Sequence, residues 1–170
     1  VFTFLGVMAD PCGLGLLFSA LADARLAAEA EVALKTVGPC AIEAAVARFK
    51  QAESAAERAA LCRFLGNQEA SEGAEAIRSG LTDTDAQVRT AAAYAAARLS
   101  DPELPSLVAD LLDDDNAAVR EAALASLRCY AGIDQQLIRS AADQLAGSVE
   151  PERRKGAALL FAAVHNGEGI

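Results

Sequence analysis

The stretch LLDDDNAAVREAAL, residues 111–124, decides the fold because the chain repeats it. Shifted by 31 residues, it lies over LTDTDAQVRTAA (81–92), so that the Val-Arg pair at 119–120 matches the one at 88–89. Two looser copies keep this arginine. One has Arg58, 31 residues before Arg89, and the other has Arg154, 34 residues after Arg120. A period of about 31 residues across the chain is typical of a solenoid, in which stacked repeats bury a continuous core.

Each repeat divides into two helices. In the first helix, apolar residues recur at the spacing of one helical face. They are Val88, Ala91, Ala92, Ala95 and Leu99 in one copy, and Val119, Ala122, Ala123, Leu127 and Tyr130 in the next. Glycine or proline then interrupts the pattern, as in SDP at 100–102, before a second apolar run begins at Leu104. The pattern predicts antiparallel helix pairs, with helices of about ten to fifteen residues.

The composition supports an all-α fold and limits the partners. Alanine, the best helix former, makes up about a quarter of the chain, whereas aromatic residues make up only 5%. The net charge of −9 disfavours nucleic acid, which needs clustered lysine and arginine, and an anionic membrane. We expect a cytoplasmic protein with protein partners, and its charge suits basic ones.

The first 22 residues carry a single charge, at Asp10. They lack a basic leader, and Pro11 interrupts the apolar run, so we expect buried helices rather than a signal peptide or a membrane span. Free solenoid ends need polar capping repeats. We therefore expect the apolar residues here to be covered by other chain segments or by self-association; they are Phe2, Phe4, Leu5, Leu16, Leu17 and Phe18.

Three aspartates, 113–115, followed by Asn116 raise the question of a cation site. An aspartate or asparagine just before a helix accepts hydrogen bonds from free backbone N–H groups, and its charge suits the helix dipole. A calcium loop would need alternating oxygen ligands, a glycine turn and a distant glutamate, which this stretch lacks. We therefore predict helix capping, by Asp115-Asn116 and by Thr84-Asp85, rather than a metal site.

The four cysteines, Cys12, Cys40, Cys62 and Cys129, are widely spaced and form no CxxC pair. This spacing predicts reduced, mostly buried thiols rather than disulfides or a zinc site. Cys12 and Cys40 each follow a proline at a predicted helix start, where the pKa of a thiol can be lowered. A redox-sensitive regulatory role for these two residues therefore stands as an alternative to simple packing.

Nothing in the sequence indicates catalysis. The single histidine, His165, lies near the C-terminal end, and no spacing places it beside a serine or cysteine nucleophile. We predict that the chain is not an enzyme and needs neither a cofactor nor a metal.

The frame D-x-x-x-x-V-R-x-A-A, at Asp83 to Ala92 and Asp114 to Ala123, resembles the HEAT repeat in its short bacterial, phycobilin-lyase-like form. The resemblance is strongest over residues 38–131. It implies a right-handed superhelix of about five antiparallel helix pairs, whose second helices line the concave face. It also implies a ladder between repeats in which Asp83 and Asp114 pair with Arg89 and Arg120, six residues on. Ala52 and Ser148 interrupt this ladder, because they replace the acid before Arg58 and Arg154.

Five polar residues on the second helices face away from the apolar side and should point into the concave groove. These candidates for partner binding are Arg48, Ser106, Asp110, Ser140 and Gln144. The leading functional hypothesis is a non-catalytic scaffold that binds a protein through this face. The alternative is an accessory or regulatory subunit or domain of an enzyme system, either phycobilin-lyase-like or redox-sensitive.

We expect one HEAT-like domain over residues 1–170, belonging to a longer array. Its approximate units are 1–22 (partial), 23–52, 53–82, 83–114, 115–147 and 148–170 (partial).

Overall fold

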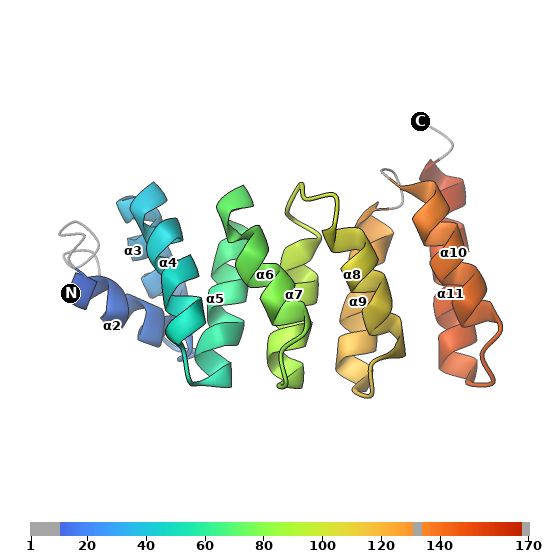
Figure 1. Cartoon of the computed structure of the whole chain (residues 1–170), viewed down its shortest axis with the longest axis horizontal. Coiled ribbons are helices and arrows are strands. Elements are labelled where there is room, and N and C mark those ends of the chain that lie inside the picture. The colour runs from blue at the N-terminus through green and yellow to red at the C-terminus, as the bar shows by residue number, and fades with distance from the viewer. Residues whose placement is uncertain (1–10, 131–133, 168–170) are drawn as a thin grey trace.

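The computed structural model describes residues 11–130 and 134–167. Its helices follow one another along one long axis, from the N-terminal to the C-terminal end (Figure 1). In chain order the elements are α2 (Pro11–Leu21), α3 (Ala27–Val37), α4 (Pro39–Gln51), α5 (Ala55–Asn67), η1 (Ser71–Gly73), α6 (Ala74–Leu81), α7 (Ala86–Ala96), α8 (Leu104–Asp110), η2 (Leu111–Asp113), α9 (Ala117–Tyr130), α10 (Gln135–Ala146) and α11 (Pro151–Gly167). The predicted all-α solenoid is confirmed.

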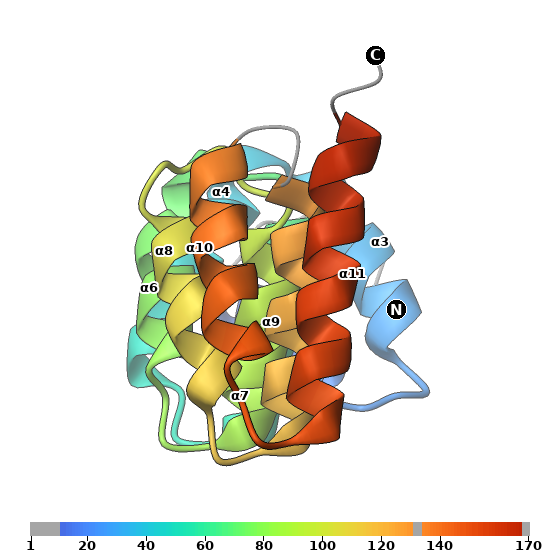
Figure 2. The ribbon, with the colours of Figure 1, turned by 90° about the vertical axis from the view of Figure 1, so that its right-hand side faces the viewer.

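The helices form two layers, which are clearest when the stack is viewed end-on (Figure 2). The first-helix layer contains α3, α7, α9 and α11, together with α5, which packs against α7. The second-helix layer contains α4, α6, α8 and α10. Helix α2 packs against α3 and α5 at the N-terminal end of the stack.

The core lies between the two layers and is built largely from small side chains. The predicted faces of α7 and α9 are buried, with Val88, Val119 and Leu127 fully enclosed. Alanines fill most of the remaining contacts between first helices, and small side chains let neighbouring helices approach closely. The closest approach is at Gly66 of α5, where an added Cβ would lie 2.7 Å from Cα and Cβ of Ala95.

Two of the second helices are shorter than the pattern predicts. Helix α6 has eight residues and follows the 3₁₀ turn η1, while α8 has seven and continues into the 3₁₀ turn η2. Pro105 occupies the first turn of α8. A proline fits there because its missing N–H would have no helical partner, but its ring disfavours helix on its N-terminal side. The long connection between α7 and α8 therefore stays outside regular helix.

Polar side chains of α9 hold it to the end of α7. The Ser126 hydroxyl donates to the carbonyl of Ala93 at 2.7 Å, and the Tyr130 hydroxyl donates to the carbonyl of Ala96. Burial raises the pKa of Tyr130 to about 12. The Ala96 carbonyl also accepts from the backbone N–H of Leu99 at 3.1 Å, so the Tyr130 hydroxyl adds a second bond to it.

The apolar residues near the N-terminus divide into three groups. Leu17 and Phe18 are buried in the core, whereas Leu16 is 60% exposed. Phe2, Phe4 and Leu5 lie outside the described residues. Among the helices that the structure describes, none combines the length and the apolar character that a membrane crossing requires.

Candidate functional site

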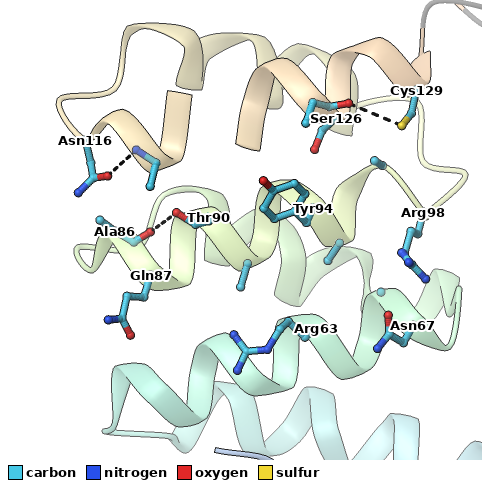
Figure 3. Close-up of a pocket in the computed structure, with 16 residues that line it drawn as sticks. Arg63, Asn67, Ala86, Gln87, Thr90, Tyr94, Arg98, Asn116, Ser126 and Cys129 are labelled. Carbon is cyan, nitrogen blue, oxygen red and sulfur yellow. Dashed lines mark hydrogen bonds between the residues drawn. The ribbon is translucent and has the colours of Figure 1, made fainter. Parts of the chain in front are cut away.

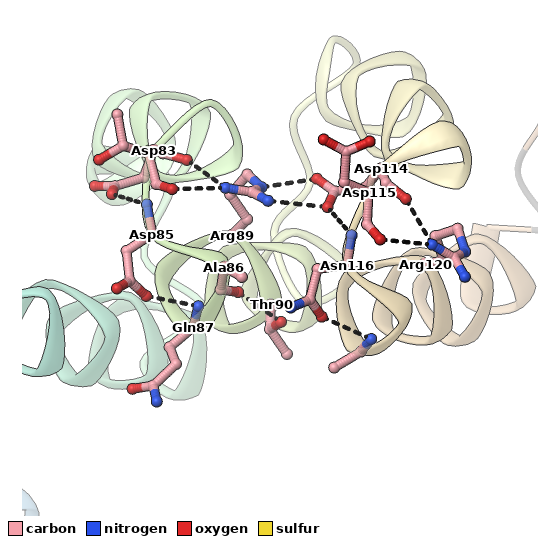
Figure 4. A network of polar contacts seen from close by, with 12 residues as sticks. Asp83, Asp85, Ala86, Gln87, Arg89, Thr90, Asp114, Asp115, Asn116 and Arg120 are labelled. Carbon is pink, nitrogen blue, oxygen red and sulfur yellow. Dashed lines mark hydrogen bonds and ion pairs between the residues drawn. The ribbon is translucent and has the colours of Figure 1, made fainter.

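An arginine in the first helix of two successive repeats joins its repeat to the next one. Arg89 of α7 donates through Nε and Nη2 to the carboxylate of Asp114, at 2.7 and 2.9 Å (Figure 4). Its Nη1 donates to the carbonyls of Asp83 and Thr84, at 2.9 and 3.0 Å. Arg58 of α5 binds the Asp83 carboxylate in the same two-pronged way, which is a strong geometry for an ion pair.

The pairing differs from the one that the HEAT resemblance implied. The prediction that the carboxylates of Asp83 and Asp114 pair with the arginines six residues on is wrong. Each carboxylate instead binds the arginine 25 residues before it. Only the backbone carbonyl of each aspartate accepts from the arginine six residues on. Each carboxylate also accepts from the backbone N–H two residues later, and this turn orients it toward the preceding repeat.

The ladder ends at Ser148. This residue keeps the local geometry of the aspartates: its carbonyl accepts from Arg154 at 3.1 Å, and its hydroxyl accepts from the N–H of Glu150 at 3.2 Å. However, its side chain is uncharged, and Arg120 finds only backbone carbonyls as partners within the described part of the chain. A cavity of about 390 Å³ opens beside Arg120, between α9 and α11.

Replacing Ser148 with aspartate should therefore stabilise the last repeat. The new carboxylate would face the free side of the Arg120 guanidinium, as Asp114 faces Arg89, and should raise the free energy of unfolding by about 1 kcal/mol. Chemical denaturation of Ser148→Asp measures this change. The same substitution combined with Arg120→Gln should show no gain, and an equal gain in both backgrounds would contradict the pairing.

The ladder also makes stability depend on pH. The hydrogen bond from Arg58 lowers the pKa of Asp83, and the hydrogen bond from Arg89 lowers the pKa of Asp114. A carboxylate whose pKa is lower in the folded state stabilises the fold above its unfolded-state pKa of about 4, and this contribution is lost as the pH falls through the folded-state pKa. Urea denaturation should show the free energy of unfolding falling below about pH 4. The free energy of unfolding should fall less steeply with decreasing pH in the Asp114→Asn variant. A pH profile identical to that of the natural chain would contradict a role for the Asp114 carboxylate.

The three consecutive aspartates have separate structural roles. Asp113 binds Arg153 of α11, Asp114 binds Arg89, and the carbonyl of Asp115 accepts from Arg120. Capping is performed by Asn116, which accepts from the N–H of Ala118 at 2.9 Å, and by Asp85, which accepts from the N–H of Gln87 at 2.8 Å. The predicted caps at Asn116 and Asp85 are thus confirmed. Among the described residues, no group of three or more histidine, cysteine, aspartate or glutamate side chains could hold a metal ion.

A groove of about 860 Å³ crosses the first-helix layer over α5, α7 and α9 (Figure 3). Its floor is made of small residues, including Gly66, Ala91 and Ala95. Tyr94 of α7 rises from this floor and is 50% exposed. An aromatic side chain on a rigid helix loses little conformational entropy on binding, which makes Tyr94 a good contact residue.

Polar side chains surround Tyr94. Arg63 and Asn67 lie on α5, and Arg98 lies just beyond the end of α7 (Figure 3). Further polar groups lining the groove are Gln87, Thr90, Asn116, Ser126 and Cys129. The groove therefore combines one aromatic ring, two guanidinium groups and several uncharged hydrogen-bonding groups over an apolar floor.

None of the five predicted contact residues lines this groove. All five lie on the second-helix layer: Arg48 on α4, Ser106 and Asp110 on α8, and Ser140 and Gln144 on α10. Ser106, Asp110, Ser140 and Gln144 are exposed. Arg48 forms an ion pair with the buried Glu57, at 2.7 Å, and Gln144 donates to Asp113 at 2.6 Å. The expectation that the second helices line the concave face stays a prediction, whereas the groove described above is formed by first helices.

One signal in the sequence could have identified Tyr94. It is the aromatic residue within the run TAAAYAAA, 90–97, where its neighbours are alanine. The buried positions of this helix are 88, 91, 92, 93, 95 and 96, so position 94 lies outside them. An aromatic residue at an outward-facing position is a candidate contact residue, because aromatic side chains are enriched at protein interfaces. Arg63 occupies the same position one repeat earlier.

The thiols are more exposed than predicted. Cys62 is buried, but Cys40 and Cys129 are exposed, so "mostly buried" is wrong for the thiols that the structure describes; the side chain of Cys12 lies outside them. Burial raises the pKa of Cys62 to about 12, with the Asp83 carboxylate adding to the effect. Cys62 is therefore a packing residue and not a reactive thiol at neutral pH.

The comparisons with known proteins agree with this architecture. One similar solved structure is that of the complex of CpcE and CpcF of phycocyanin lyase from Nostoc sp. PCC7120, at 20% identity over 89% of this chain and 99% of that chain, with a TM-score of 0.75. An engineered protein is similar at 18% identity, over 98% of this chain and 89% of that chain, with a TM-score of 0.60. No curated protein matches the sequence.

The family assignment rests on the sequence itself. The model of the family described as HEAT repeats matches residues 42–128, which include the two clearest copies of the repeat and both arginine–aspartate pairs between repeats. The chain belongs to the HEAT-repeat family.

Proposed function

We propose that this chain is a non-catalytic scaffold that binds another protein through the groove on the first-helix layer. The observation that carries the proposal is the exposed Tyr94 at the centre of a groove shared by three helices. The arginine ladder and the alanine core fix those helices relative to one another, so the surface is already organised before a partner arrives. Such a surface can spread its contacts over several repeats.

The test compares three baits in affinity capture from a lysate of the source cells, followed by mass spectrometry. The first bait is the natural chain, and the second carries Tyr94→Ala. The third carries Asp110→Lys and Ser140→Lys, which change the second-helix layer at exposed positions. Removing an aromatic side chain at the centre of an interface costs about 2 kcal/mol or more, so capture should fall clearly in the second bait and persist in the third.

A protein that behaves in this way must then be purified and bound directly to the chain. Equal capture of a protein by all three baits would count against the groove as the surface that binds it. Loss only in the third bait would return the binding role to the second-helix layer, where the sequence had predicted it.

A second candidate is an accessory subunit or domain of an enzyme system. The observation in its favour is the similarity to the complex of CpcE and CpcF of phycocyanin lyase, which covers nearly the whole of the matched chain. If this chain handled a pigment, the protein purified from its source should absorb visible light, and a colourless preparation that takes up no added pigment would argue against that role. Regulation through thiols would require Cys40 or Cys12 to react faster than the same residues in the denatured chain.

A further inference from the structure

The charge of the groove is opposite to that of the chain. The protein carries a net charge of −9, yet the 16 residues that line the groove include Arg63 and Arg98 and no acidic residue. A concave surface with one sign of charge concentrates ligands of the other sign. The local surface therefore selects a different partner from the basic one that the net charge suggests.

The two groove arginines have no carboxylate partner among the described residues. By contrast, six arginines outside the groove form ion pairs with acids; they are Arg25, Arg48, Arg58, Arg78, Arg89 and Arg153. No such pair or side-chain hydrogen bond involves Arg63 or Arg98 within the part of the chain that the structure describes. Their guanidinium groups are exposed to solvent and free to bind an incoming acid.

Acidic residues near the groove are already engaged or point elsewhere. Glu31 of α3 accepts from Asn67 at 3.2 Å and pairs with Lys35 at 3.5 Å. Asp85 is used as the cap of α7. Glu121 of α9 lines the other cavity, on the side that faces α11. The positive charge of Arg63 and Arg98 is therefore left without a neutralising carboxylate in the groove itself.

The same groove as the two arginines offers an apolar contact, the ring of Tyr94. Tyr94 lies four residues before Arg98, which follows the end of α7, and Arg63 lies on the neighbouring helix α5 (Figure 3). Alanines 91 and 95 beside Tyr94 leave room for an incoming side chain. A guanidinium group binds a carboxylate with two parallel hydrogen bonds, and an aromatic ring packs against an apolar or aromatic side chain.

We infer that the partner segment is acidic: it places carboxylates against Arg63 and Arg98 and an apolar or aromatic side chain against Tyr94. This inference rests on the proposed function, because it assumes that the groove binds protein. The inference adds the chemical character of the segment that the groove binds. Asn67, Gln87 and Asn116 at the rim supply uncharged groups for the backbone of that segment.

The experiment is a selection of random peptides displayed on phage against the immobilised chain. A parallel selection uses a groove variant, Arg63→Gln with Arg98→Gln. A control variant, Arg25→Gln with Lys50→Gln, makes the same change in net charge at exposed side chains outside the groove. Circular dichroism melts confirm that both variants fold like the natural chain.

Peptides enriched on the natural chain should carry aspartate or glutamate on both sides of an apolar residue. Their dissociation constants, measured by fluorescence anisotropy, should rise about tenfold in the groove variant and stay unchanged in the control variant. Added salt should weaken binding to the natural chain more than binding to the groove variant.

The outcomes separate the inference from the proposed function. Enriched peptides that lack acidic residues and lose binding to the Tyr94→Ala variant would overturn the acidic partner and leave the groove as a protein-binding surface. Acidic peptides that bind all three proteins equally would also overturn the inference, because their binding would not use these arginines. Failure to enrich any peptide that depends on Arg63, Tyr94 or Arg98 would overturn both.

Discussion

Replacing Asp114 with alanine is expected to lower the free energy of unfolding by about 3 kcal/mol. The Asp114 side chain is only 8% exposed, and it accepts from two nitrogens of Arg89 as well as from the N–H of Asn116. Its removal leaves the half-buried charge of Arg89 unpaired, and the loss of the partner of a buried charge is the costly event. Urea denaturation followed by circular dichroism measures the change.

The neighbouring aspartate provides the control. Asp115 is exposed, its side chain makes no hydrogen bond within the described residues, and alanine keeps its backbone carbonyl, so Asp115→Ala should cost less than about 1 kcal/mol. Asp114→Asn should lie between the two, because an amide oxygen can still accept from Asn116 but cannot neutralise Arg89. Equal losses for Asp114→Ala and Asp115→Ala would show that the ion pair between repeats does not stabilise the stack.

Replacing Gly66 with valine is expected to lower the free energy of unfolding by about 2–3 kcal/mol. Helix α5 contributes no side chain at this contact with α7, and a Cβ added at Gly66 would lie 2.7 Å from Cα and Cβ of Ala95. One of these atoms is backbone, so the clash cannot be relieved by a change of rotamer, and the two helices must separate. Thermal and urea denaturation measure the loss.

A second glycine gives the opposite expectation. Gly15 of α2 has no atom within 4 Å of an added Cβ, so Gly15→Ala should raise stability by about 0.5–1 kcal/mol through helix propensity alone. Gly66 also lines the groove, so separating α5 from α7 should weaken binding of the acidic peptides. If Gly66→Val were as stable as the natural chain, the close approach of α5 and α7 would not be a constraint on the fold.

The repeat period and the apolar faces were readable in the sequence because both follow from local rules. Helices arise from alanine content and from apolar positions at helical spacing, and Val88 and Val119 are buried as that spacing predicts. The caps at Asp85 and Asn116 were equally predictable, since a cap bonds to N–H groups a few residues away. Such features need only the near neighbours of a residue in the chain.

Only the tertiary structure shows the contacts between residues of different repeats. The sequence placed Asp114 six residues from Arg120 and 25 residues from Arg89, and only the stacking of α7 on the loop before α9 selects the distant arginine. In the same way, the groove exists because α5, α7 and α9 bring Arg63, Tyr94 and Arg98 onto one surface. Helical periodicity by itself determined which residues are buried. Which outward-facing side chains meet, and in which layer they form a binding surface, was set by how one repeat rests on the next.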